Sequence, residues 1–168
     1  MSDAALFVYS PIKVPPRLRD IVSAASGAWQ VAFFAEGCDY LAPSDARLES
    51  CVVLGWRPGI QLPIDVASVT LLEANPELDV LLDAGVIVAA SVLVNLHQWY
   101  SRTAEHSGRA IDPLVLSRLQ ATSSVFVVCA SEVRNPEETA FLFDLASAIS
   151  VCTDGVVDDR SHDMFYPS

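Results

Sequence analysis

Short apolar runs, amphipathic segments and turn residues alternate along this chain, and the alternation predicts a mixture of strands and helices. Runs rich in β-branched and aromatic residues, each bounded by Gly, Pro or polar residues, predict strands. Between the first two runs, Leu18, Ile21, Val22 and Ala25 recur on one helical face, which predicts a helix over 16–26. The predicted strands are 4–10, 29–35, 51–56, 66–72, 125–130 and 155–157.

Several further helices are predicted from their starting residues. Asn135, Pro136 and Glu138 resemble a capped helix start, and apolar residues from Phe141 onward recur with helical spacing until about Ser150. Similar signals predict helices over 75–85 and 112–122, and 95–108 is expected to be a short helix that runs into a loop. The continuous apolar run 86–94 is compatible with a strand buried on both faces or with a buried helix, and we favour the strand.

A weak internal repeat bears on the fold. Phe7-Val8, a proline turn and the helix at Asp20 resemble Phe126-Val127, a proline turn and the helix at Asp144. Two β-α-β units in one chain are consistent with a ferredoxin-like or split β-α-β arrangement. We therefore expect an α+β fold with one mixed or antiparallel sheet of five to seven strands, covered by three to four helices.

Composition narrows the class of protein. The 168 residues suit a single domain, with residues from about 158 onward expected as a polar tail. Apolar residues make up 52%, which excludes an intrinsically disordered chain. The formal net charge is −11, and a nucleic-acid backbone would be repelled by that field. We therefore expect no nucleic-acid partner.

The compartment follows from signals that the sequence lacks. No basic region precedes an apolar stretch at the N-terminus, and no apolar run reaches the roughly 18 residues that a membrane span requires. We therefore expect a cytoplasmic protein without a membrane partner. In that compartment Cys51, Cys129 and Cys152, which lie in apolar surroundings, are interpreted as small buried hydrophobic residues rather than as disulfides.

The C-terminal acids form the densest cluster of candidate metal ligands. Oxygen ligands at alternating loop positions can hold Ca²⁺ or Mg²⁺, but the spacing lacks an EF-hand pattern, and a solvated acidic terminus is the plainer interpretation. We predict no metal or other cofactor. The candidate ligands are Asp154, Asp158, Asp159, His162 and Asp163.

Catalytic chemistry has only weak candidates. Cys38 follows Gly37 in a polar loop and could pair with a histidine as a nucleophile, but Glu36 and Asp39 should raise its pKa. His97 and His106 are nine residues apart, which is not the spacing of two metal ligands on one helix. No catalytic residue is assigned on this basis.

Aromatic residues with nearby arginines are the candidate binding residues, because Trp, Tyr and Arg are enriched at interface hot spots. Acidity points to the partner: residues 36–83 carry a net charge of −7 and residues 132–168 a net charge of −6, which would attract a basic protein. Solubility alone, and aromatic rings that only seal the core, are the plainer explanations. The candidates are Trp56, Trp99, Tyr100 and Arg102.

Two functional hypotheses from different classes follow. The first is a non-catalytic acidic protein of a bacterial type that binds a basic protein partner, for example in an immunity or antitoxin-like role. The second is a small enzyme whose site is assembled from Cys38, His97, His106 and the C-terminal acids. A structural homo-oligomer, such as a dimer that buries its aromatic side chains, is a third alternative.

Overall fold

One antiparallel sheet of eight strands, in the order β3-β2-β4-β5-β6-β1-β7-β8, organises the computed structural model. The structure describes residues 4–12, 14–27, 29–35, 39–49, 51–58, 64–73, 96–122, 124–130, 136–159 and 164–167. The strands are β1 (Ala4–Ser10), β2 (Gln30–Phe34), β3 (Tyr40–Leu41), β4 (Cys51–Trp56), β5 (Ile64–Glu73), β6 (Ser124–Ala130), β7 (Val156–Asp159) and β8 (Met164–Pro167). The helices are α1 (Leu18–Ala25), α3 (Leu96–His106), α4 (Pro113–Gln120) and α5 (Pro136–Thr153).

These elements confirm the expected α+β class and the single sheet. All six predicted strands are present, and the helices predicted around 16–26, 95–108, 112–122 and 136–150 are also present. Two further strands, β3 and β8, were not expected and bring the described sheet to eight strands. The predicted helix at 75–85 and the apolar run 86–94 lie outside the described residues.

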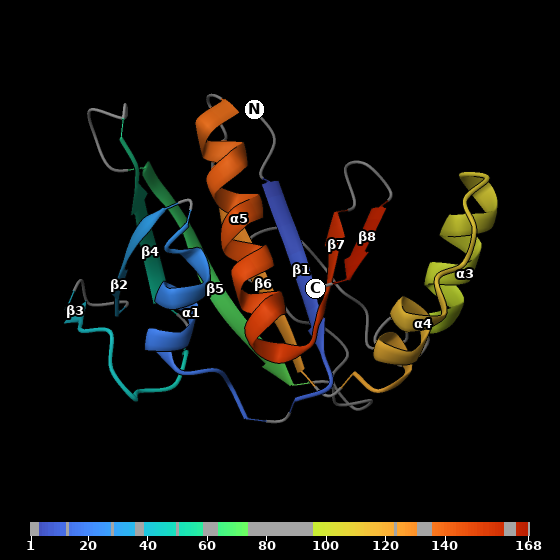
Figure 1. Ribbon diagram of the computed structural model, residues 1–168, viewed down its shortest axis with the longest axis horizontal. Coiled ribbons are helices and arrows are strands. Elements are labelled where there is room, and N and C mark those ends of the chain that lie inside the picture. Colours follow the sequence, from blue (N-terminus) through green and yellow to red (C-terminus); the bar gives the residue numbers. More distant parts are fainter. Residues whose placement is uncertain are drawn as a thin grey trace.

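Two split β-α-β units build the sheet. Helix α1 connects β1 to the parallel strand β2, and α5 connects β6 to the parallel strand β7, with β1 lying between β6 and β7. Helices α1 and α5 pack side by side over the same face of the sheet (Figure 1). The residues of the weak repeat meet at its centre, because Phe7 pairs with Val127 and Val8 with Phe126. Both units therefore connect parallel strands that are not adjacent in the sheet, as in the expected split β-α-β arrangement.

The main core lies between this helical layer and the sheet. Leu18, Ile21 and Ala25 of α1 are buried there at the predicted spacing. The stripe predicted on α5 is buried as well, apart from Cys152, which is only partly buried. Its buried members are Phe141, Leu142, Leu145, Ala148 and Ile149.

The central strands are buried on both faces. Leu6 and Val8 of β1 face α5, whereas Phe7 and Tyr9 are equally buried on the other side and their rings stack at 6.3 Å. Helix α4 contacts β1, β7 and β8. Its first turn is capped by Asp112, whose carboxylate accepts a hydrogen bond from the Leu114 N–H, as its Asp-Pro start predicted.

The chain after α5 differs from the expected polar tail. Asp154 ends the helix in the left-handed conformation, and the Gly155 N–H then bonds the Ser150 carbonyl, as in a Schellman turn. Strand β7 follows and pairs with β1, so Asp158 is buried rather than solvated. The burial is tolerated because the carboxylate has a partner: the Tyr9 hydroxyl donates a hydrogen bond to Asp158 Oδ2 at 2.8 Å.

Candidate binding surface

The strip of sheet formed by β2, β3 and β4 is apolar on both of its faces. Side chains alternate along a strand, and Phe33, Cys51 and Val53 point into the core under the helices. The alternate positions point to the opposite face and are almost all apolar. We define the aromatic face as Ala32, Phe34, Tyr40, Val52, Leu54 and Trp56.

The strand register arranges these six residues in rows. Tyr40 pairs with Phe34, and Phe34 pairs with Val52, so these three residues form one row. The rings of Phe34 and Tyr40 lie 5.7 Å apart in a tilted geometry. Ala32 pairs with Leu54 in the next row, and Trp56 pairs with Gln30 in the third. Aromatic rings therefore lie in the first and third rows, with the smaller aliphatic side chains of Ala32 and Leu54 between them.

Much of the aromatic face is open to solvent. Tyr40 is 60% exposed and Trp56 38% exposed, which are large values for aromatic residues, while Phe34, Val52 and Leu54 are partly exposed. Helix α1 covers β2 from the core side, α4 contacts strands at the other end of the sheet, and α3 packs on α4 (Figure 1). No helix in the described part of the chain packs on the aromatic face.

Proline explains why β3 is so short. The strand pairs only with Phe33 and Phe34, and its continuation would place Pro43 opposite Val31. Proline has no N–H to donate across the ladder. The chain instead bends at residues 43–45. On its outer edge β2 therefore pairs only at Phe33 and Phe34, and Pro43 prevents β3 from continuing the ladder.

A polar anchor holds the end of β4 from the core side. The Arg57 guanidinium lies 4.4 Å from the centroid of the Trp29 ring and forms an ion pair with Glu137 at the start of α5. The Trp29 indole N–H donates a hydrogen bond to Asp144 Oδ2 at 2.7 Å. Because neighbouring residues on a strand face opposite sides, anchoring Arg57 leaves Trp56 directed to the aromatic face.

Exposed acidic residues lie where β3 and β4 begin, on the side of Leu41 and Cys51 rather than on the aromatic face. Asp39 precedes Tyr40, Glu49 lies just before β4, and both are exposed. The Glu49 charge also affects Cys51: burial, with a further contribution from Glu49, raises the pKa of the Cys51 thiol to about 12. Both acids belong to the segment 36–83, whose net charge is −7. The part of the sequence that contains the strip therefore carries a net negative charge.

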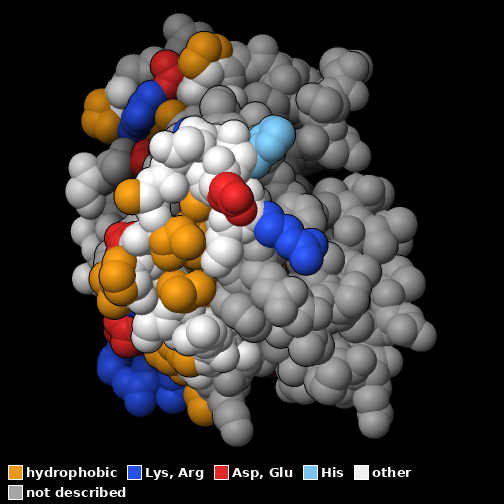
Figure 2. All heavy atoms as spheres, turned by 90° about the vertical axis from the view of Figure 1, so that its right-hand side faces the viewer, with side chains coloured by type: hydrophobic (Ala, Val, Ile, Leu, Met, Phe, Trp, Pro, Cys, Tyr) orange, Lys and Arg blue, Asp and Glu red, His pale blue; other side chains and the backbone are white. Residues whose placement is uncertain are grey.

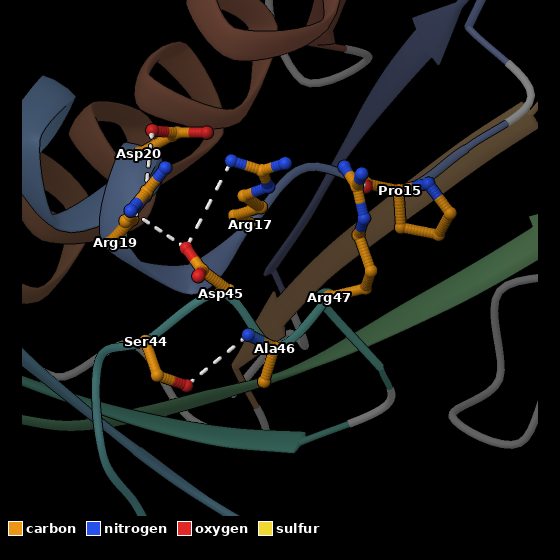
Figure 3. A network of polar contacts seen from close by, with 8 residues as sticks. All are labelled: Pro15, Arg17, Arg19, Asp20, Ser44, Asp45, Ala46 and Arg47. Atoms are coloured by element: carbon orange, nitrogen blue, oxygen red, sulfur yellow. Dashed lines mark hydrogen bonds and ion pairs between the residues drawn. The ribbon is translucent and has the colours of Figure 1, made fainter.

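The three arginines near the start of α1 have a structural role. Arg19 and Arg17 lie 2.7 Å and 3.9 Å from Asp45, and Arg47 donates to the Pro15 carbonyl at 3.0 Å (Figure 3). The same loop occupies the helix start, because the carbonyls of Ala46 and Ser44 accept from the first N–H groups of α1. These contacts fasten the 44–47 loop to the helix.

The predicted catalytic residues are not brought together by the described structure. Cys38 lies outside the described residues. His97 and His106 are both in α3, nine residues or about two and a half turns apart, which is not the spacing of neighbours on one helical face. His106 is exposed. The structure therefore supplies no geometry for a Cys–His pair.

The candidate metal ligands are also spread out where they are described. Asp154 is exposed at the end of α5, whereas Asp158 and Asp159 are buried and, as neighbours in β7, face opposite sides of the sheet. His162 and Asp163 lie outside the described residues. Within the described part of the chain, no three His, Cys, Asp or Glu side chains gather as a metal-binding group.

The predicted binding residues of α3 have different surroundings. Tyr100 is buried, and its hydroxyl accepts a hydrogen bond from the Asp112 N–H at 2.7 Å, which ties α3 to α4. Arg102 is exposed, and the side chain of Trp99 is not among those that the structure describes. Figure 2 shows hydrophobic and charged side chains interspersed on this side of the molecule. Ile111 and Leu114 are the exposed large apolar residues near α4.

Phe34 and Tyr40 are binding candidates that sequence reasoning missed. The polar stretch between the predicted strands 29–35 and 51–56 carries no strand pattern, which hides the short strand that contains Tyr40. A signal was available in the alternation of Ala32, Phe34, Val52, Leu54 and Trp56, because a strand facing water on one side should carry polar residues at such positions. Apolar residues on both faces indicate that the second face is meant to be covered.

Comparison with known proteins adds no identity. No protein-family model, curated protein or solved structure matches the chain. Among the described residues, no helix is both long enough and apolar enough to cross a membrane. Function must therefore be argued from the surface itself.

Proposed function

We propose that this chain is a non-catalytic binding protein that holds a basic protein partner on its aromatic face. The observation that carries the proposal is the cross-strand arrangement of Phe34, Tyr40 and Trp56 on an open strip of sheet. Exposed apolar residues that are contiguous, rather than scattered singly, mark interaction sites. Tyr and Trp are also the residues that contribute most at such sites.

Charge supports a basic partner over a second copy of this chain. Each copy carries a net charge of −11, so two copies would repel one another, whereas a basic surface would be attracted. Asp39 and Glu49, exposed at the starts of β3 and β4, add to the negative field that such a partner would meet. An immunity or antitoxin-like protein that neutralises a basic partner is one role that uses such a surface.

Site-specific photocrosslinking tests the proposal. Benzoylphenylalanine would replace Tyr40 or Trp56 in the full-length chain, expressed in cells of its source, with Ile111 as the control position because it is similarly exposed. We expect adducts from positions 40 and 56 with one protein of net positive charge, identified by mass spectrometry, and none of that protein from position 111.

Three results would contradict the proposal. The first is equal adduct formation from all three positions, which would indicate nonspecific contact. The second is an adduct between two copies of this chain, which would support the homo-oligomer instead. The third is the absence of adducts from positions 40 and 56, which would mean that the aromatic face has no partner.

A further inference from the structure

The form of the partner can be inferred from the same strip of sheet, and this inference rests on the proposed function. We infer that the partner presents an amphipathic α-helix of about three turns, with basic flanks, to the aromatic face. Three observations lead to this inference: the blocked edge of β2, the dimensions of the aromatic face, and the way in which the chain covers the other face of the same strip.

The blocked edge argues against an added strand. An extended peptide that joins a sheet forms main-chain hydrogen bonds with an edge strand. On the outer side of β2, β3 already pairs with Phe33 and Phe34, which leaves only Gln30, Val31 and Ala32. Strands are most often about five to six residues long, so a stretch of three residues beside the bend at Pro43 offers an added strand few hydrogen bonds.

The aromatic face itself offers side chains rather than backbone groups. A segment laid on apolar side chains loses water from its own N–H and C=O groups, so these must already be paired. A helix satisfies them within one segment, whereas an isolated extended segment does not. The face therefore favours a helical element over an extended one.

The dimensions also suit one helix. Two strand spacings separate β3 from β4, which is about 10 Å and close to the diameter of a helix with its side chains. Along the strands, the row of Phe34 and the row of Gln30 are four residues apart, which is about 14 Å. A helix of about nine to eleven residues covers that length.

The chain itself shows how the other face of this strip is covered. The eight-residue helix α1 lies over β2 on the core side and buries Leu18, Ile21 and Ala25. We expect the partner helix to bury a similar stripe against Ala32 and Leu54, between the rings of Tyr40 and Trp56. Basic residues beside that stripe would be attracted by the net negative charge of the segment 36–83.

The spacing of crosslinks within the partner tests the helical form. Positions 40 and 56 are about 17 Å apart when the along-strand and across-strand separations are combined. If the partner segment is helical, residues about eleven apart in its sequence react with the two positions. If the segment is extended, the reacting residues are about five apart. The mapped adducts distinguish these cases.

A substitution in the partner gives a second measurement. Proline at the midpoint between the two adduct sites should weaken binding to the full-length chain at least about tenfold, because it breaks a helix, while alanine at the same place should leave affinity within about twofold. Adducts about five residues apart, adducts in segments distant in sequence, or a tolerated proline would overturn the helical form. Each of these results would leave the proposed function standing, which fails only if positions 40 and 56 give no partner-specific adduct.

Discussion

Asp158 shows how one hydrogen-bonded side chain can accompany the burial of a segment that looks polar in sequence. A buried carboxylate is costly unless it is hydrogen-bonded, and Asp158 is only 1% exposed. Its partner, Tyr9, is 149 residues away in sequence and reaches it only because β1 and β7 are neighbours. Sequence reasoning assigned this acid to a polar tail, since no local pattern reveals a partner so distant along the chain.

Removing the Tyr9 hydroxyl should therefore destabilise the protein. In Tyr9→Phe, Asp158 loses a donor while remaining buried, and we expect the free energy of unfolding to fall by about 1–3 kcal/mol. Urea unfolding followed by circular dichroism measures this change. Tyr40→Phe is the control, because Tyr40 is exposed, and its stability should change by less than about 0.5 kcal/mol. Equal effects in both variants would show that the buried bond does not stabilise the fold.

Cys51 is expected to be chemically inert. Its pKa is raised from 9.0 to about 12 by burial and by Glu49. At pH 8 the thiolate fraction should therefore be about a thousandfold lower than that of an ordinary cysteine. Alkylation at pH 8, followed site by site with mass spectrometry, should be slow at Cys51 in the folded chain and fast in urea. Cys152 is only partly buried, so it should react before Cys51; the reverse order would contradict this account.

The same raised pKa has a consequence for stability. The unfolded thiol releases its proton near pH 9, whereas the folded thiol keeps it until about pH 12. The contribution of the buried thiol is therefore fully present below pH 9 and is lost as the pH rises through that interval. The stability difference between the protein and Cys51→Ala should shrink over the same interval.

At the scale of elements, local patterns predicted most helices and strands but not the shortest strands. Helix α5 was predictable because its apolar residues recur over about three turns. Strand β4 was predicted with its observed bounds, from Cys51 to Trp56. Strand β3 has only two residues and carries no period of its own, so its pairing depends on β2 rather than on its sequence.

Gly55 lies where β4 comes very close to the Phe141 ring of α5. A Cβ atom built at this position would overlap the ring of Phe141 in α5. We expect Gly55→Ala to lower the free energy of unfolding by about 1–3 kcal/mol because the core becomes overpacked. The thermal midpoint measures this effect, with Gly27→Ala as the control, since nothing lies within 4 Å of a Cβ atom there.

A second substitution should separate packing from other causes. Combining Gly55→Ala with Phe141→Leu makes room for the new methyl group. The double variant should therefore lose less stability than the two single variants lose together. Strict additivity, or a Gly55→Ala variant as stable as Gly27→Ala, would show that α5 does not approach β4 this closely.

At the scale of the whole molecule, the order of strands creates the candidate surface. Trp56 was singled out from sequence for its residue type and its neighbour Arg57, but its companions Phe34 and Tyr40 become neighbours only through long-range pairing. Sequence patterns indicate which residues alternate along a strand, whereas strand order depends on packing across the whole chain. For this reason the α+β class was predictable and the aromatic face was not.

Charge close to the strip of β2, β3 and β4 should control how fast the partner is captured. Asp39→Lys places a positive charge beside Tyr40, and we expect the association rate to fall several-fold at low salt, with the difference fading as salt screens the charges. Surface plasmon resonance with the crosslinked partner measures this rate. Glu105→Lys in α3 makes the same change in net charge away from the aromatic face and should have a smaller effect. Equal effects would mean that only net charge matters.

Affinity measured on two matched double variants tests the central claim most directly. Isothermal titration of the crosslinked partner would be carried out with two double variants. The first combines Tyr40→Ser and Trp56→Ser, and the second combines Ile111→Ser and Leu114→Ser. Both are checked for unchanged thermal midpoints. All four residues are exposed and apolar, at 60%, 38%, 46% and 48% respectively. We predict at least about a tenfold loss of affinity for the first variant and less than about threefold for the second. Unchanged affinity in the first variant, or equal losses in both, would contradict a binding site on the aromatic face.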